Sequence, residues 1–189
     1  PNPASVLAFI ENHDTDRFLG EGDNLPMLKQ ASTLLLTTRR IPQLYYGTEV
    51  MMNGVKSKSD GYVRKDFPGG WTGDATNALT PAGRTKIQNE CYDFYKTILN
   101  WRKGNDVIAK GNMVQFMVQN GVYAYARQYE GKTVFVMLNG TDAETTVPLK
   151  FYKEILKNSK QGKDILSGKA ITFGEELKMG PRESLVIEL

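Results

Sequence analysis

Hydrophobic residues run almost without interruption through two short segments of the N-terminal half. The first, SVLAFIEN, spans residues 5–12, and the second, IPQLYYG, spans residues 41–47. Such short continuous runs are typical of strands buried on both faces, as in a parallel sheet covered by helices. Between them, residues 23–40 carry leucines at helical spacing after a candidate cap at Asn24. The order predicts a parallel strand–helix–strand unit with a right-handed crossover.

A long polar stretch and a second helical stretch follow. Residues 48–81 are rich in Gly, Asp, Lys and Pro, and loops of this length inside a compact domain are uncommon and usually functional. Residues 81–103 then return to helical spacing, which predicts a second long helix. This first region ends near Asn105.

From Gly111 onward the pattern changes to short alternating runs, which indicate strands. Turn signals at Asn120-Gly121, Glu130-Gly131 and Asn139-Gly140 separate the early runs and predict antiparallel hairpins. The sequence therefore predicts an α/β region over residues 1–105 and an all-β region, a small antiparallel β-sandwich, over residues 106–189.

Composition and charge narrow the class of protein. A chain of 189 residues can bury a core, and its net charge of +3 is spread along the chain without a basic block, which argues against nucleic-acid binding. Cys91 is the single cysteine and cannot form an internal disulfide. No apolar run approaches the roughly 20 residues of a membrane span. The start, PNPASV, has neither an initiator Met nor a leader pattern, so we expect a piece of a longer protein of undetermined compartment.

Polar residues gather where the first apolar run ends, in the string FIENHDTDR. His13, Asp14, Asp16 and Arg17 then lie at the carboxyl end of a buried strand, where α/β barrels keep their active sites. The plain alternative is that Asp14 or Asp16 caps a turn and that His13 is a core histidine. A metal site fits less well, because no second His or Cys is near.

Three sequence motifs follow one another along the chain: FIENHDTDR, then IPQLYYGTE, then DGYVRKDFPGGW. Together they resemble the α-amylase superfamily, glycoside hydrolase family 13, and within it the neopullulanase and cyclomaltodextrinase branch. The resemblance covers essentially the whole chain. It implies that residues 1–105 are the last two βα units of a TIM (β/α)8 barrel, strands seven and eight with their helices, and that residues 106–189 are the C-terminal β-sandwich.

The resemblance also implies roles for individual residues. Asp14 matches the third catalytic carboxylate, which holds two ring hydroxyls and favours the oxocarbenium-like transition state, and His13 matches the histidine that contacts the same sugar. Asn12 and Arg17 are expected to orient these groups or to reach a neighbouring sugar.

The loop after the second apolar run supplies the other expected sugar contacts. Asp60 and Arg64 have the spacing of the pair that holds a donor-side sugar in this branch, although Asp60-Gly61 replaces the more usual Asp-Pro. Trp71 is a candidate for stacking on a sugar face, with packing on the barrel rim as its alternative.

A retaining glycosidase needs a nucleophile and an acid/base carboxylate about 5 Å apart. In the family these follow barrel strands four and five and precede the NHD motif, and a full barrel needs roughly 250 residues. We therefore expect part of a hydrolase of α-1,4- or α-1,6-glucans that is inactive alone. The exposed barrel face should pair with a missing N-terminal barrel portion or self-associate. No cofactor or metal ligand set is expected in these residues, and the family's calcium sites would lie in the missing part.

Two other functions remain open. A non-catalytic sugar-binding or structural module would show an exposed aromatic platform on the sandwich, for which Tyr123, Tyr125 and Tyr129 are candidates. Their alternation also fits one packed face of a strand. A self-sufficient hydrolase would pair Asp14 with Asp16 or Glu49, which no resemblance supports.

Overall fold

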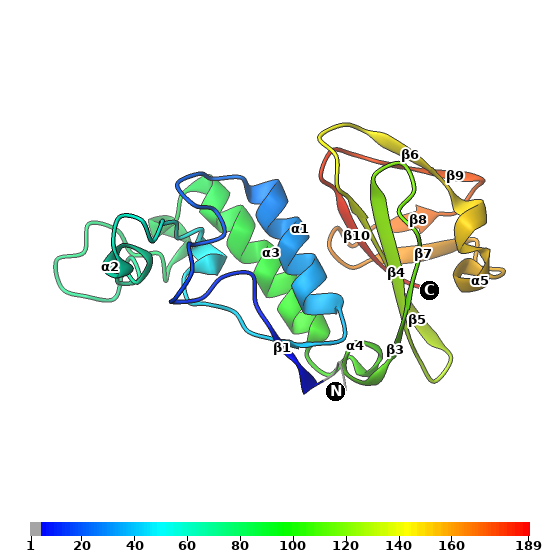
Figure 1. Ribbon diagram of the computed structural model, residues 1–189, viewed down its shortest axis with the longest axis horizontal. Coiled ribbons are helices and arrows are strands. Elements are labelled where there is room, and N and C mark those ends of the chain that lie inside the picture. The colour runs from blue at the N-terminus through cyan, green and yellow to red at the C-terminus, as the bar shows by residue number, and fades with distance from the viewer. Residues whose placement is uncertain (1–4) are drawn as a thin grey trace.

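Two long helices lie beside a β-sandwich, and a loop region extends from the far side of the helices (Figure 1). This computed structural model describes residues 5–189, so the first four residues of the expected barrel segment lie outside it. Among the described residues, no helix is both long enough and apolar enough to cross a bilayer.

The predicted order of strand, helix and strand is present. Strand β1 (Leu7–Ala8) pairs in parallel with β2 (Ile41–Pro42), and helix α1 (Leu25–Thr37) connects them. The Asn24 side chain caps α1 by accepting a hydrogen bond of 3.0 Å from the Met27 backbone N–H.

Both strands are shorter than the apolar runs that predicted them, and their burial on both faces was wrongly predicted. Leu7 is 53% exposed and Ile41 is 50% exposed. The reason is that, within residues 5–189, each strand pairs only with the other, so one edge of each has no neighbour.

The long loop and the second helix agree with the sequence. The loop contains three short helical turns: η2 (Thr48–Val50), α2 (Asp60–Val63) and η3 (Pro81–Gly83). Helix α3 (Lys86–Arg102) begins with a capping box between Thr85 and Gln88, and the short α4 (Asp106–Lys110) leads into the strands.

The β-region contains a six-stranded antiparallel sheet and a two-stranded one. In spatial order the larger sheet is β3 (Asn112–Gln115), β4 (Val122–Tyr129), β5 (Lys132–Asn139), β10 (Ser184–Glu188), β7 (Gln161–Asp164) and β8 (Ala170–Thr172). The smaller sheet pairs β6 (Thr145–Pro148) with β9 (Glu176–Met179), and η4 (Leu149–Tyr152) and α5 (Lys153–Leu156) follow β6.

Two of the three predicted hairpins are confirmed. Glu130-Gly131, with both φ angles positive, joins β4 to β5, and Asn120-Gly121 joins β3 to β4. The third prediction was wrong: after Asn139-Gly140 the chain leaves the large sheet, since β5 already has β4 and β10 as neighbours.

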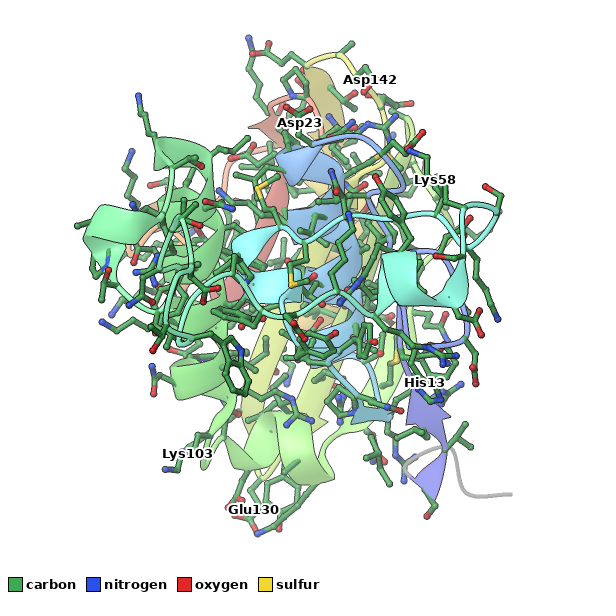
Figure 2. All side chains as sticks on the ribbon, turned by 90° about the vertical axis from the view of Figure 1, so that its left-hand side faces the viewer. His13, Asp23, Lys58, Lys103, Glu130 and Asp142 are labelled. Atoms are coloured by element: carbon green, nitrogen blue, oxygen red, sulfur yellow. The ribbon has the colours of Figure 1, made fainter. Side chains whose placement is uncertain are left out.

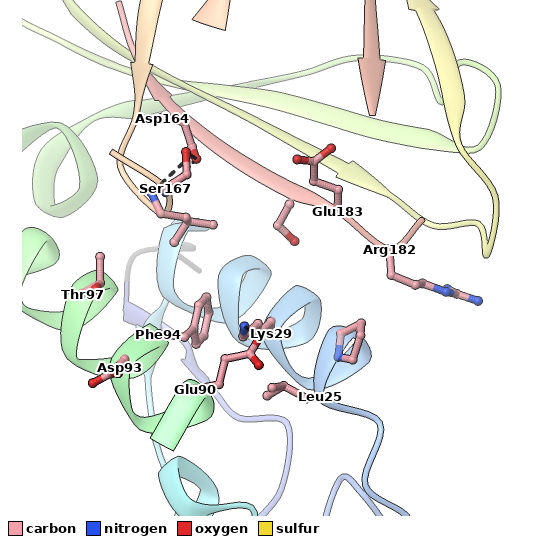
Figure 3. A pocket seen from close by; sticks show the side chains of 13 residues that line it. Leu25, Lys29, Glu90, Asp93, Phe94, Thr97, Asp164, Ser167, Arg182 and Glu183 are labelled. Carbon is pink, nitrogen blue, oxygen red and sulfur yellow. Dashed lines mark hydrogen bonds and ion pairs between the residues drawn. The ribbon is translucent and has the colours of Figure 1, made fainter. Parts of the chain in front are cut away.

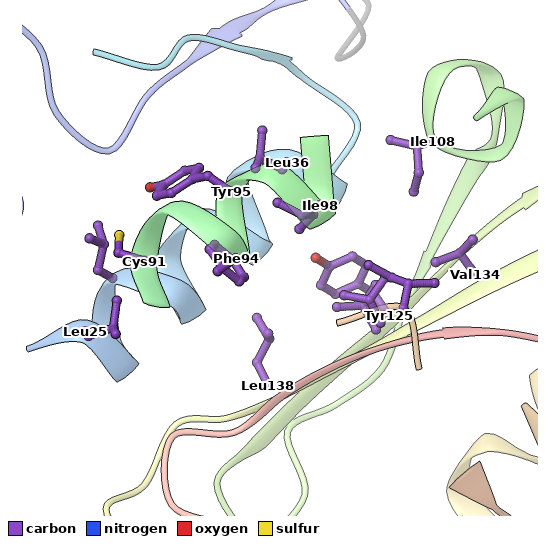
Figure 4. Close-up of a cluster of buried hydrophobic side chains, with 14 of the residues drawn as sticks. Leu25, Leu36, Cys91, Phe94, Tyr95, Ile98, Ile108, Tyr125, Val134 and Leu138 are labelled. Atoms are coloured by element: carbon purple, nitrogen blue, oxygen red, sulfur yellow. The ribbon is translucent and has the colours of Figure 1, made fainter. Parts of the chain in front are cut away.

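One face of the large sheet packs against the helices. Figure 4 shows this cluster, in which Leu36 of α1 and Phe94 and Ile98 of α3 meet Tyr125 and Leu138 of the sheet. The other face packs against β6, β9 and the turns that follow β6. The helical region and the sandwich thus share one hydrophobic cluster that crosses residue 105.

The three tyrosines of β4 face the helices. Tyr125 is fully buried and its hydroxyl contacts that of Thr37 in α1, while Tyr123 and Tyr129 are partly buried against the same cluster. The packed-face interpretation of their spacing is confirmed, and the exposed platform is absent at these positions.

Arg127 of β4 joins the helices to the sheet. Its guanidinium is buried and donates to three carbonyl oxygens, each at 2.8 Å: those of Thr37, Ile108 and Gly111. No carboxylate faces it in the described part of the chain, and burial lowers its pKa to about 10. The C-terminal ends of α1 and α4 are therefore anchored at one point of the sheet.

Candidate functional site

The loop after β1 presents His13 and Asp14 to solvent. Asn12 shapes it by accepting from the backbone N–H of Asp14 at 2.8 Å, and Thr15 Oγ1 accepts from the N–H of Asn12 at 3.1 Å. The side chains of His13 and Asp14 are 59% and 61% exposed. A core histidine is therefore ruled out, and Asn12 forms the turn in place of Asp14.

Arg64 brings the two candidate loops together. Its Nη2 atom lies 3.2 Å from Asp14 Oδ1 and 3.3 Å from Asp60 Oδ2, and its Nε donates to the carbonyl of His13 at 2.9 Å. Lys56 Nζ donates to the carbonyl of Asp14 at 3.0 Å and lies 3.5 Å from Asp60. These five residues form what we call the loop cluster, at the end of the molecule toward the viewer in Figure 2.

The loop cluster offers both signs of charge in a small exposed area. Two carboxylates accept hydrogen bonds, two cations donate them, and His13 Nε2 lies 3.2 Å from Asp14 Oδ2. Such a set suits a neutral ligand rich in hydroxyl groups, because hydroxyls both donate and accept. No group of three or more His, Cys, Asp or Glu side chains within residues 5–189 is arranged to hold a metal ion.

Glu11 and Arg17 lie beneath this surface. Glu11 is 2% exposed and accepts from Arg17 Nη1 at 3.2 Å, from Thr48 Oγ1 at 2.5 Å and from the N–H of Phe18 at 2.5 Å. The sequence reasoning missed Glu11 and Thr48. A carboxylate interrupting an apolar run was the signal that could have found Glu11.

Two other predicted sugar contacts, Arg17 and Trp71, form no hydrogen bond or ion pair with the loop cluster in the described part of the chain. Arg17 is 1% exposed, so its side chain faces the interior. Of the two roles expected for it, this placement favours orienting its neighbours over reaching a sugar. Trp71 is 71% exposed; its backbone N–H donates to Asp74 Oδ2 at 2.9 Å and its carbonyl accepts from the Asp74 N–H at 3.3 Å.

A separate cavity of about 440 Å³ lies between the helices and the sandwich (Figure 3). Several of its polar side chains are already engaged: Lys29 pairs with Glu90 at 2.6 Å, and Asp164 accepts from the Ser167 hydroxyl at 2.6 Å. Arg182 turns away from the cavity in Figure 3 and pairs with Asp142. The loop cluster is therefore the better candidate site.

Comparison with known proteins agrees with the sequence motifs. Residues 113–188 match the family described as the cyclo-malto-dextrinase C-terminal domain. An α-amylase of Niallia circulans is 31% identical over 176 residues, which are 89% of this chain and 29% of that protein. A cyclomaltodextrin glucanotransferase of Thermoanaerobacterium thermosulfurigenes is 31% identical over 184 residues, or 93% of this chain and 22% of that enzyme.

Solved structures show the same fold. An Anoxybacillus α-amylase superposes with a TM-score of 0.75 at 20% identity, covering 99% of this chain and 38% of the amylase. The α-amylase of Geobacillus thermoleovorans, solved with acarbose, gives a TM-score of 0.75 at 23% identity over 98% of this chain and 39% of the amylase.

The chain spans less than a third of the length of these two curated relatives. Most of its sandwich, residues 113–188, matches the cyclo-malto-dextrinase C-terminal domain, and the three motifs precede these residues in the chain. By these matches the chain is homologous to the C-terminal portion of α-amylase-family enzymes, glycoside hydrolase family 13.

Proposed function

We propose that the loop cluster is the donor-side part of the active site of a retaining α-glucan hydrolase. In this proposal Asp14 is the third catalytic carboxylate and His13 binds the sugar at the cleavage site, while Asp60 and Arg64 hold the next sugar. Residues 5–105 act as the last two βα units of a (β/α)8 barrel, which the parallel pairing of β1 with β2 across α1 supports.

The observation that carries the proposal is the contact of Arg64 with Asp14 and Asp60. Asp14 precedes Asp60 by 46 positions and Arg64 by 50 positions in the chain, yet the three side chains meet at one exposed place. Separate sequence motifs predicted them. A carboxylate whose hydrogen bonds to ring hydroxyls tighten as the ring becomes positively charged stabilises the transition state selectively.

The nucleophile and the acid/base are proposed to lie outside these 189 residues. Relatives are more than three times longer, and the nearby carboxylates are occupied: Asp16 accepts from the Lys56 N–H at 2.5 Å, and Asp60 pairs with two cations. The chain alone should therefore bind α-glucans without cleaving them.

Calorimetric titration with maltohexaose tests the proposal. Asp14→Asn should weaken binding about tenfold, since a charged acceptor contributes about 1.5 kcal/mol or more. Asp142→Asn is the matched control, because Asp142 is an exposed, arginine-paired carboxylate on the sandwich. Equal binding by the two variants would contradict the proposed site.

Release of reducing ends from maltooligosaccharides, pullulan and cyclodextrin should stay at the background level of Asp14→Asn. Turnover that Asp14→Asn abolishes would mean that this chain assembles a complete site, against the proposed location of the other two carboxylates.

A further inference from the structure

The ion pair of Glu11 and Arg17 bridges three segments that carry or flank the loop cluster. Arg17 Nε donates to the carbonyl of Val63 at 3.1 Å, directly before Arg64, and Nη1 donates to the carbonyl of Tyr46 at 2.7 Å. Glu11, directly before Asn12, binds the hydroxyl of Thr48.

The surroundings hold the guanidinium in one orientation. Its centre lies 3.9 Å from the ring centre of Tyr45 and 4.9 Å from that of Tyr46. The backbone N–H of Arg17 also donates to the carbonyl of Gly54 at 2.9 Å. A Cβ at Gly54 would come within 2.6 Å of the Tyr62 carbonyl oxygen, so the chain can approach α2 this closely only with glycine there.

Stability alone is a poor explanation for this pair. A buried ion pair contributes little over well-packed apolar side chains, because desolvation of both charges offsets their attraction. The pair does fix geometry, since each charged group binds fixed backbone or side-chain atoms of another segment.

We propose that Glu11 and Arg17 are positioning residues, which set the distance between the His13–Asp14 turn and Arg64 from below. They touch no substrate and act through the loop cluster. Their part in sugar binding rests on the proposed function, whereas their effect on His13 and Arg64 does not.

The first arm of the test needs no sugar. The chain has a single histidine, so the imidazole C–H signals of His13 in an NMR spectrum report the turn without ambiguity. Thr48→Val removes one donor to Glu11 and should shift or broaden the His13 signals and the Arg64 Nε–H signal. Thr48→Ser keeps a hydroxyl and should restore the wild-type signals.

Thr33→Val is the matched control, because Thr33 is a buried threonine of α1 whose hydroxyl donates, among residues 5–189, to the Lys29 carbonyl alone. It should leave both signals unchanged. Glu11→Gln, which keeps the shape but not the charge, should act like Thr48→Val. If Glu11→Gln does not fold, the variants at Thr48 and Thr33 still test the positioning role. Unchanged His13 and Arg64 signals in Thr48→Val would overturn the proposal.

The second arm adds maltohexaose. Thr48→Val should weaken binding about fivefold, and Thr48→Ser should bind as the wild type does. Absence of binding by the wild type would refute the proposed function alone, because the sugar-free signals still decide the positioning role. Wild-type affinity in Thr48→Val together with unchanged signals would refute positioning alone.

Discussion

Two buried arginines in this chain, Arg17 and Arg127, have their charges stabilised by different kinds of partner. Arg17, beneath the loop cluster, has a carboxylate partner in Glu11 and two tyrosine rings beside it. Arg127, between the sheet and the helices, has carbonyl oxygens as its only hydrogen-bond partners among the described residues, and they come from the C-terminal ends of two helices, α1 and α4.

The difference separates two kinds of region. Around Arg127 the surrounding carbonyls terminate helices, so this arginine completes backbone hydrogen bonding and contributes mainly to stability. Around Arg17 the partners are atoms of loops and of the single-turn helix α2, which no sheet or long helix holds in place. That region therefore depends on side chains to set its shape, and the exposed polar residues lie above it.

Arg127→Met should cause the largest loss of stability, about 4 kcal/mol, because three buried carbonyls lose their donor. Urea unfolding measures it, with Lys132→Met, at the exposed first residue of β5, as control. His13 signals should stay in place despite the loss. A loss below about 1 kcal/mol would show that water or backbone shifts replace the guanidinium.

Glu11→Ala should cost about 3 kcal/mol, because it leaves Arg17 buried without a counter-charge. Here the His13 signals should move as well, which is the contrast with Arg127→Met. Glu21→Ala removes the exposed partner of Lys58 and should change stability by no more than about 1 kcal/mol. Equal losses in the two glutamate variants would remove the distinction between buried and exposed pairs.

Alkaline pH should weaken the helix–sheet cluster. Burial raises the pKa of Cys91 to about 12 from 9.0, and burial also raises the pKa of Tyr95 and Tyr125. Since the unfolded thiol ionises first, stability is full below pH 9 and is lost as pH rises toward 12. At pH 10 the Cys91 part is about 1 kcal/mol, so Cys91→Ala should flatten the decline in unfolding free energy. An identical pH slope in that variant would contradict the assignment.

Trp71→Ala should have the smallest effect on stability, within about 0.5 kcal/mol, because the side chain is exposed and packs little. Thermal unfolding checks this, with Trp101→Phe as the comparison, since the Trp101 indole N–H donates to Glu188 at 2.7 Å. A larger loss in Trp71→Ala than in Trp101→Phe would show that its loop packs tightly.

Periodicity predicted the two long helices and the change to strands well, and Asn24 was a candidate cap of the first helix, because these signals are local. The extent of β1 and β2 could not be predicted from local sequence, since strand length depends on neighbours to pair with. Asn139-Gly140 failed as a hairpin for the same reason: the turn is local, but the pairing of β6 with β9 is not.

The sequence named the exposed residues of the loop cluster except Lys56, and of the buried residues beneath it the sequence named Arg17 but not Glu11 or Thr48. Asp14 and Arg64 came from motifs, and their contact is a tertiary fact that spacing alone does not give. Glu11 and Thr48 lie inside two of the sequence motifs but were given no role there, and their hydroxyl–carboxylate bond spans 37 residues. Hydrogen-bond networks of this kind depend on which loops come into contact in the folded chain.

The most direct test of the central claim is a maltohexaose titration followed at the imidazole signals of His13. We expect a saturable shift in the wild type and in Asp142→Asn, and a much weaker response in Asp14→Asn. Signals that stay fixed while the sugar binds, or that move equally in both variants, would contradict the placement of the glucan at the loop cluster.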